Sequence, residues 1–166
     1  RTLAASGNAA GGGRAMRTYL VVIDDSEESR LAQRFATRRA ARTGGTVHIV
    51  VALERPGFVA WGGVQATIEE EARQQGEAVA QAAANAIYEG AGIRPSVTVK
   101  QGDAADIVRE ILAEDREIAA LVLGAAASGP PGPLVSHFTG DGAGSLPVPV
   151  MIVPGSLSED ELDRLS

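Results

Sequence analysis

The sequence predicts an α/β fold in which a parallel sheet is covered by helices on both faces. From Tyr19 onward, short apolar runs typical of buried strands alternate with longer segments that carry helical periodicity and capping signals. The 166 residues suit one domain, since a chain of this length buries roughly 70% of its unfolded surface. No apolar stretch approaches the ~20 residues that span a bilayer, so we expect no membrane association.

The first strand is predicted at residues 19–23, with a helix directly after it. Asp25 and Glu28 are three residues apart, the spacing of a capping box in which two side chains satisfy free backbone donors at a helix start. We therefore expect this helix to begin after Asp25. Gly44 and Gly45 follow a basic run and are predicted to end it.

The same alternation continues to the end of the chain. Thr67 and Glu70 form a second capping-box spacing and are predicted to open a long alanine-rich helix, which Gly90 and Gly92 end. The remaining predicted elements are strands at residues 46–53, 96–101, 119–123 and 148–153 and helices at residues 67–88 and 104–115.

Composition excludes several classes of partner and site. A net charge of -6 argues against a nucleic-acid or anionic-membrane surface, because either needs an excess of Lys and Arg on one face. The chain has no Cys, so it has no disulfide or thiolate metal site, and we expect it in the cytoplasm. Fourteen of the fifteen basic residues are Arg, which we attribute to genome composition.

Both ends of the chain are predicted to lie outside the domain. Residues 1–16 are small, Gly-rich and without periodicity, so we expect a disordered extension or a remnant added for expression. The domain is expected at residues 17–155. Residues 156–166 are expected to form an acidic tail that begins like a short helix.

Four motifs resemble those of the universal stress protein family over nearly all of residues 19–154. They are VVIDDSEES at residues 21–29, like the family's first strand and Asp-x-Ser-x-x-Ser turn; QGDAADI at residues 101–107, like its Gly-Asp-Pro-x-x-x-Ile helix entry; ALVLG at residues 120–124, like its Asp-Leu-Ile-Val-x-Gly strand; and VPVMIV at residues 148–153, like its closing strand. Each motif alone is weak. Four in the right order and at the right separations identify the chain as a member of the family.

The resemblance implies an adenine nucleotide alpha hydrolase-like fold, a doubly wound five-stranded parallel sheet in the order 3-2-1-4-5. Strands one and four are then neighbours, and their carboxyl ends form the switch point where ATP-binding members hold the nucleotide. Asp24 matches the Asp that contacts the adenosine portion in those members, and Gly124 matches the first glycine of their phosphate loop. The alternative is that Asp24, Asp25 and Ser26 only cap the first helix.

The phosphate loop of this sequence departs from the family pattern Gly-x2-Gly-x9-Gly-Ser/Thr. Ala127 stands three residues after Gly124, where the second glycine is expected. The spacing recurs at Gly129, Gly132 and Gly142, but five residues too late, and we interpret this recurrence as chance. Gly129 and Gly132 nevertheless join Asp24 and Gly124 as the candidate cofactor-binding residues, should the loop be rearranged around a nucleotide.

Two physical arguments weaken a triphosphate site. Pro130, Pro131 and Pro133 have no N–H group, so this segment cannot form an unbroken row of donors around an anion. Between Arg116 and Arg164 there is no Lys or Arg to neutralise phosphate charge. We therefore do not expect tight ATP binding, and we leave the cofactor open, with ATP or another adenine nucleotide as the alternative.

The strand at residues 148–153, from Val148 to Val153, is apolar on both faces and is the sheet edge in the resembled family. Members commonly dimerise through this strand, so the resemblance implies a homodimer. The alternative is that the acidic tail covers the edge. Phe58 and Trp61, in the loop before the second helix, either close over the cleft or fill the core.

No constellation of residues points to catalysis. His48 lies mid-strand and is interpreted as a packed or face-exposed strand residue. The sequence has no His-x-x-His spacing for a transition metal and no Gly-x-Ser-x-Gly nucleophile turn. The sequence therefore predicts a non-enzymatic stress-response or regulatory module that binds a protein partner, with a small ligand as an additional option, and does not hydrolyse ATP. The alternative is an adenine-nucleotide-binding stress regulator that uses Asp24 and the loop after strand four.

Overall fold

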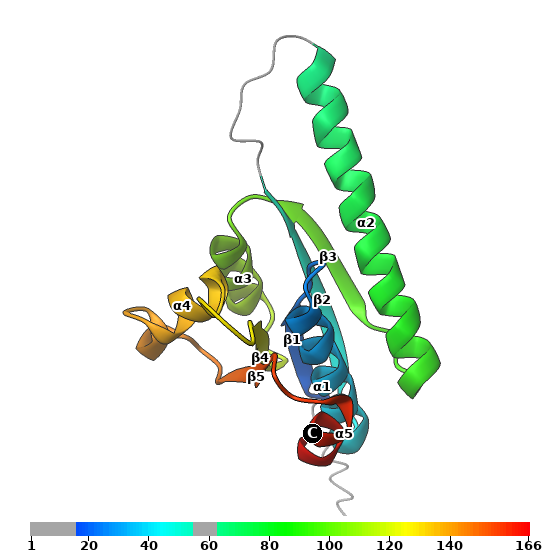
Figure 1. The fold of residues 1–166 in the computed structure, drawn as a ribbon, viewed down its shortest axis with the longest axis vertical. Coiled ribbons are helices and arrows are strands. Elements are labelled where there is room, and N and C mark those ends of the chain that lie inside the picture. Colours follow the sequence, from blue (N-terminus) through cyan, green and yellow to red (C-terminus); the bar gives the residue numbers. More distant parts are fainter. Residues whose placement is uncertain (1–15, 55–62) are drawn as a thin grey trace, which may run out of the picture.

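Five parallel strands form one sheet in the order β3-β2-β1-β4-β5, as expected. The structure is a computed structural model that describes residues 16–54 and 63–166 (Figure 1). The strands are β1 (Thr18–Val22), β2 (Thr46–Leu53), β3 (Ser96–Gln101), β4 (Ile118–Ala125) and β5 (Val150–Pro154). The helices are α1 (Glu27–Thr43), α2 (Gly63–Ala91), α3 (Ala104–Glu114), α4 (Pro133–Thr139) and α5 (Glu159–Leu165), with a short 3-10 helix at Ala143–Ser145.

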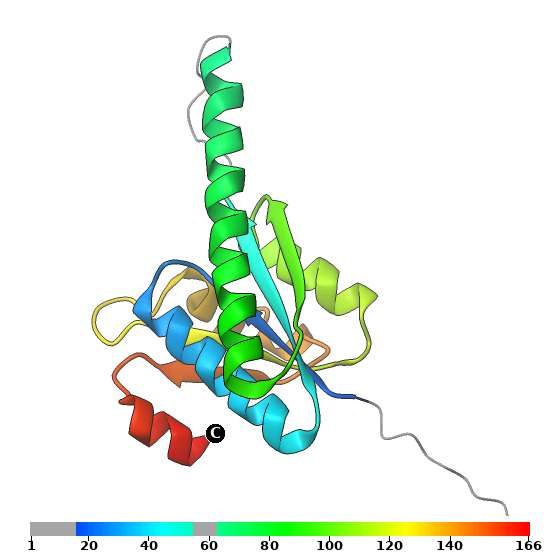
Figure 2. The ribbon, with the colours of Figure 1, turned by 90° about the vertical axis from the view of Figure 1, so that its right-hand side faces the viewer.

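The sheet separates two hydrophobic cores, which makes the fold doubly wound. Successive residues of β1 enter opposite cores, because side chains alternate across a strand. Val21 joins the core under α1 and α2, whereas Leu20 joins the core under α3 and α4. Figures 1 and 2 show the helices on the two faces. Among the described helices, none is both long and apolar enough to cross a membrane.

Helix α1 begins one residue later than predicted. Ser26, not Asp25, is its N-cap, and the Ser26 side chain accepts a hydrogen bond from the Ser29 amide at 3.2 Å. The Asp25/Glu28 capping box is therefore wrong. At the other end the prediction is confirmed, because Gly44 adopts the left-handed conformation (φ 67°) that ends many helices.

Helix α2 is longer than predicted. It begins at Gly63, so Thr67 lies about one turn inside the helix and is not its cap. Its first half rises beyond the sheet, whereas its second half packs on β2 and β3 (Figure 1). Gly90 is still helical, and Gly92 (φ 68°) ends the helix. Phe58 and Trp61 lie outside the described residues.

The segment after β4 is better ordered than its Gly- and Pro-rich sequence suggests. Residues 133–139 form α4 because Val135 and Phe138, three residues apart, are both buried against the sheet. Strand β5 starts at Val150 and not at Val148. Pairing between β4 and β5 begins at Val150, so Val148 and Pro149 lie outside the paired strand. The Leu121 amide still donates to Pro149 O at 2.9 Å.

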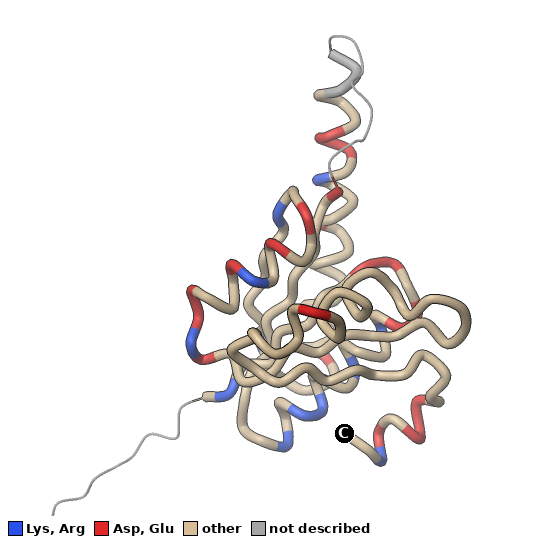
Figure 3. Tube along the Cα trace, turned by 90° about the vertical axis from the view of Figure 1, so that its left-hand side faces the viewer, with Lys and Arg blue, Asp and Glu red and all other residues tan. Residues whose placement is uncertain are grey.

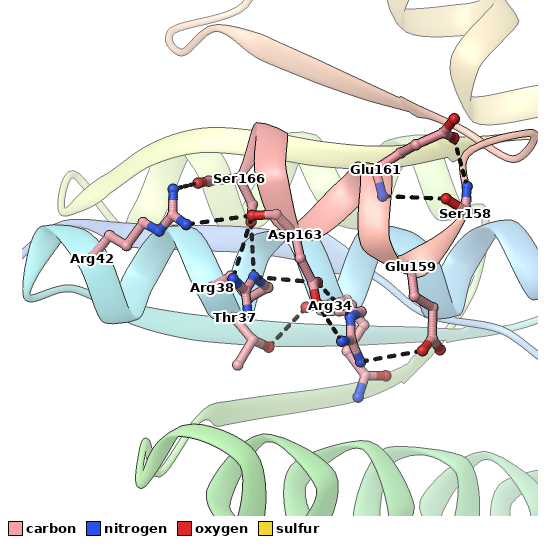
Figure 4. Close-up of polar contacts among 10 residues, drawn as sticks. Arg34, Thr37, Arg38, Arg42, Ser158, Glu159, Glu161, Asp163 and Ser166 are labelled. Carbon is pink, nitrogen blue, oxygen red and sulfur yellow. Dashed lines mark hydrogen bonds and ion pairs between the residues drawn. The ribbon is translucent and has the colours of Figure 1, made fainter.

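The acidic tail forms α5 and packs on α1. Arg34 donates two hydrogen bonds of 2.7 Å to the two carboxylate oxygens of Asp163, and Arg38 Nε lies 3.3 Å from Asp163 Oδ1 (Figure 4). Leu162 is 0% exposed and joins the core under α1. The tail thus docks beside α1 (Figure 2) and does not pair with the outer edge of β5.

This docking is expected to weaken at acid pH. The hydrogen bonds from Arg34 lower the pKa of Asp163 below its ordinary value and raise the pKa of Arg34. A carboxyl whose pKa is depressed by folding stabilises the folded form above its unfolded pKa and loses that contribution as pH falls through its folded pKa. We therefore expect α5 to detach progressively below about pH 4, near the ordinary carboxyl pKa.

Helix-sensitive NMR shifts of α5 amides between neutral and acid pH would measure this detachment. In Asp163→Asn the corresponding amides are expected to show loosened packing already at neutral pH, with a smaller further change on acidification. Unchanged α5 shifts down to about pH 2 in the unsubstituted protein would contradict the prediction, since nearly every carboxyl is protonated there.

Candidate functional site at the strand switch point

The carboxyl ends of β1 and β4 meet at a small cavity of about 120 Å³. This is the switch point of the sheet, because the chain leaves these neighbouring strands toward opposite faces. The cavity is lined by the ends of the two strands, the first turn of α1 and the start of α4: Val22, Asp24, Ser26, Glu28, Ser29, Leu123, Gly124, Pro131, Gly132, Pro133, Leu134 and Val135.

Asp24 is tied into the turn between β1 and α1. Its Oδ1 accepts a hydrogen bond from the Ser26 amide at 2.7 Å. Ser29 is buried, and its hydroxyl donates to Asp24 O at 3.1 Å and accepts from the Asp24 amide at 3.0 Å. These bonds hold an exposed carboxylate at the mouth of the cavity. Asp24 therefore orders the start of α1 and also lines the candidate site.

Gly124 is required by packing between α1 and β4. A Cβ at this position would lie 2.2 Å from Glu28 O and 2.5 Å from Glu28 C, far closer than a side chain tolerates. The first turn of α1 thus passes directly over the end of β4. This contact accounts for the glycine without any ligand.

The loop after β4 folds back over the strand end. The Ala126 amide donates to Pro131 O at 3.1 Å, which closes the turn and brings Gly132 against the cavity. Gly132 has φ 116° and is the N-cap of α4. Gly129, with φ 72°, is exposed in the turn and does not line the cavity. The structure therefore brings Asp24, Gly124 and Gly132 together and leaves Gly129 apart.

The chemistry of this cavity is acidic, without cationic side chains among the described residues of its lining. Asp24 and Glu28 supply carboxylates, and none of the described residues that line it is Lys, Arg or His. The helix that begins beside it starts at Pro133, which has no N–H, so the first helical turn offers one donor fewer than usual. These features disfavour several phosphate groups at this position.

His48 is a packed residue of β2, as predicted. Its Nε2 lies 2.8 Å from Thr98 Oγ1 on β3, and burial lowers its pKa, partly offset by the charge of Asp115. Within residues 16–54 and 63–166 there is no cluster of three or more His, Asp or Glu side chains placed to hold a metal ion.

A larger cavity, about 590 Å³, lies away from the strand ends and was missed in the sequence. It is a groove beside α1, lined by Arg30, Gln33, Arg34, Thr37, Arg38, Ala41 and Arg42 of α1, by Ala86, Ile87, Gly90 and Ala91 of α2, and by Glu159 of α5. The sequence feature that indicates this groove is a series of arginines four residues apart. Attributing the abundance of Arg to genome composition overlooks this spacing.

Several solved structures are similar in fold. The universal stress protein UspA from Lactobacillus plantarum is 14% identical with a TM-score of 0.69, over 84% of this chain and 98% of that one. A protein of the family from Burkholderia pseudomallei is 18% identical with a TM-score of 0.66, over 86% and 98%. One from Archaeoglobus fulgidus, in complex with dAMP, is 17% identical with a TM-score of 0.56, over 83% and 98%.

Sequence comparisons give the family directly. No curated protein matches the chain in a sequence search. The model of the universal stress protein family, in contrast, matches residues 16–154. This range contains the whole sheet, both strand ends of the switch point and the loop between β4 and β5. The chain belongs to the universal stress protein family.

Proposed function

We propose that this protein is a regulatory binding module of the stress response that engages a protein partner and does not hydrolyse ATP. The observation that carries the proposal is the size and charge of the switch-point cavity. Ligand pockets for small molecules usually measure ~300–1000 Å³, whereas this cavity measures about 120 Å³ and presents two carboxylates. An adenine nucleotide with its phosphates is larger than this space.

The closed form of the loop after β4 supports the same proposal. Because Ala126 and Pro131 are hydrogen bonded, Pro131 and Gly132 occupy the space above the strand ends. Opening that space requires breaking this bond and moving the start of α4, which Val135 and Phe138 anchor in the core. A bound nucleotide would have to compensate this cost without any nearby cation to contact its phosphates.

We further propose a homodimer through residues 148–153. β5 is the last strand of the sheet, and its outer edge has no strand partner among the described residues. Ile152 is 39% exposed there, and α5 packs on α1 instead of pairing with the edge. An apolar edge strand left open in this way favours pairing with another chain.

The second candidate function is adenine-nucleotide binding. Asp24, Gly124 and Gly132 line one cavity, and this juxtaposition is the observation that favours it. Universal stress proteins of similar fold are solved in complex with dAMP, AMP and cAMP. In this chain the nucleotide would use the free oxygen of the Asp24 carboxylate and backbone donors of a rearranged loop.

Nucleotide content decides between the two functions. Freshly purified protein is denatured and the released material analysed for adenine nucleotides; the emptied protein is then titrated by calorimetry with ATP and Mg²⁺ and separately with AMP. We expect no released nucleotide and no heat of binding. Nucleotide that is present and rebinds at micromolar affinity would refute the first function and establish the second.

An Asp24→Ala variant gives this experiment its control. If nucleotide binds at the switch point, Asp24→Ala is expected to weaken it at least tenfold, since a hydrogen bond to a charged group contributes about 1.5–3 kcal/mol. Asp25→Ala, which changes the neighbouring carboxylate outside the cavity, should leave binding unchanged. Binding that is insensitive to both changes would place the nucleotide elsewhere.

A further inference from the structure

The groove beside α1 is built by one face of that helix between two others. Its floor is the stripe of α1 at residues 30, 33, 34, 37, 38, 41 and 42, which recur at the three- and four-residue spacing of one helical face. The C-terminal part of α2 forms one wall and α5 contributes Glu159 (Figure 4). At about 590 Å³ it is in the size range of a real binding site.

Four arginines form a ladder along this floor. Arg30, Arg34, Arg38 and Arg42 are each four residues apart, so they span about 18 Å of the helix axis at roughly 6 Å per step. The whole chain carries a net charge of -6, so this stripe is a local positive region on an acidic protein. Figure 3 shows basic positions of the body close to the mostly acidic C-terminal helix.

Helix α5 already shows which chemistry the ladder recognises. Its carboxylates Glu159 and Asp163 are also four residues apart, and they meet the ladder in register: Glu159 lies 3.8 Å from Arg34, and Asp163 contacts both Arg34 and Arg38. An acidic helix therefore fits these arginines, because carboxylates four residues apart on one helix have the same spacing as arginines four residues apart on the other.

Two carboxylates do not saturate four guanidinium groups. Arg42 donates to Asp163 O and to Ser166 O of the last residue in the sequence, and it meets no Asp or Glu side chain among the described residues. Arg30 is exposed and forms no ion pair with any residue that the structure describes. Within the described chain, the ladder thus keeps an unpaired guanidinium at Arg30, beyond the segment that α5 covers.

The remaining wall of the groove is apolar. Ala86, Ile87, Gly90 and Ala91 of α2 face the arginines across it, and Ile87 is 1% exposed at its base. A site with charged groups on one side and apolar groups on the other suits an amphipathic segment. A long polyanion such as a nucleic acid gains little from the apolar wall and is repelled by the net charge of the chain.

We propose that the arginine ladder binds an acidic helical segment of a protein partner, whose carboxylates recur every four residues. The segment pairs with Arg30 and competes with α5 for Arg34, Arg38 and Arg42, while its apolar side contacts α2. The inference rests on the proposed function in that it specifies the partner's chemistry and docking place. It involves no residue of the switch-point cavity.

The test uses the full chain and a designed probe. The probe is a fluorescent alanine-based peptide of about 16 residues with glutamates at four-residue spacing, long enough to follow the ~18 Å ladder; its control carries glutamine at those positions. Fluorescence anisotropy at about 50 mM salt, where screening is modest, measures both affinities. We expect saturable binding of the glutamate peptide and none of the glutamine peptide.

Two substitutions move the affinity in opposite directions. Arg30→Gln is expected to weaken binding about threefold, the effect of one partly exposed ion pair, whereas Arg116→Gln, an exposed arginine outside the groove, should change nothing. Asp163→Asn is expected to strengthen binding about threefold, because it frees Arg34 and Arg38 from their internal carboxylate.

The proposal is overturned by any of three results. They are failure of the glutamate peptide to bind, equal binding of both peptides, and equal losses in Arg30→Gln and Arg116→Gln. A single-stranded RNA oligomer that binds with Arg30 dependence while the peptide does not would assign the ladder to a nucleic acid instead. Nucleotide found in the calorimetric experiment would refute the proposed function but leave this peptide result standing, so the two failures are distinguishable.

Discussion

A Gly124→Ala variant is expected to lose about 3 kcal/mol of unfolding free energy, at the upper end of what overpacking costs. The added Cβ would sit 2.2 Å from Glu28 O, and this atom belongs to the backbone of the first turn of α1 and cannot rotate away. Relief requires α1 to move off β4, which would disturb Leu31 and Ala32 in the core. Urea denaturation followed by circular dichroism measures the change.

Other glycines supply matched controls for this substitution. Nothing lies within 4 Å of a Cβ added at Gly144 or at Gly90, and neither has a positive φ. Gly90→Ala, inside α2, should even stabilise the protein by about 0.5–1 kcal/mol, because alanine is the better helix former. If Gly124→Ala proved as mild as Gly144→Ala, the close approach of α1 to β4 would be wrong.

The Gly124 result bears on how glycines in this family are interpreted. The resemblance assigns Gly124 to a phosphate loop, whereas its contact with Glu28 gives a packing reason for glycine that exists without a ligand. A protein can therefore keep this glycine after losing nucleotide binding. Its presence alone does not distinguish the two candidate functions.

The strands were predictable because buried parallel strands are apolar runs with clear ends. The structure confirms the predicted bounds of β2 (Thr46–Leu53) and β3 (Ser96–Gln101), which lie between glycine or proline turns. β5 starts later than predicted because Pro149 has no N–H to donate to a ladder. The strand order followed from the resemblance and not from periodicity.

Helix starts were harder to predict because several polar residues competed for each. Asp24, Asp25 and Ser26 are all good N-caps, and the tertiary position of Ser29, which bonds both Ser26 and Asp24, decides among them. In α2 the helix simply continues upstream of Thr67, to Gly63. Local capping signals do not say which of several starts packing will select.

The sequence predicted which strand ends meet at the candidate site but not the shape of the cavity between them. Ligands of open parallel sheets bind where neighbouring strand ends diverge, which predicts that Asp24 and Gly124 lie together. In the structure both residues line the same cavity. The turn that bonds Ala126 to Pro131 and so narrows the cavity is a three-dimensional feature of a Gly- and Pro-rich loop, for which periodicity gives no signal. The arginine groove was missed for a different reason, because a composition argument replaced a check of helical spacing.

Replacing Phe138 with alanine is expected to lower the unfolding free energy by about 3–5 kcal/mol, the usual cost of deleting a buried aromatic ring. Phe138 is 1% exposed in the core between the sheet and α3, and the guanidinium of Arg109 lies 5.4 Å from its ring centroid. Little of α4 other than Phe138 and Val135 is buried. Removing the ring therefore takes away both core volume and the main anchor of this helix.

The loss is expected to be local as well as global. Without Phe138, amides of α4 should exchange with solvent faster than those of β1 and β4, because α4 can open without unfolding the sheet. Hydrogen exchange followed by mass spectrometry measures this difference, and Ser136→Ala, an exposed position of the same helix, is the control, expected within about 0.5 kcal/mol of the parent. Uniform acceleration across all strands would show instead that α4 opens only together with the core, and the start of α4 beside the switch-point cavity would then be a fixed part of the fold.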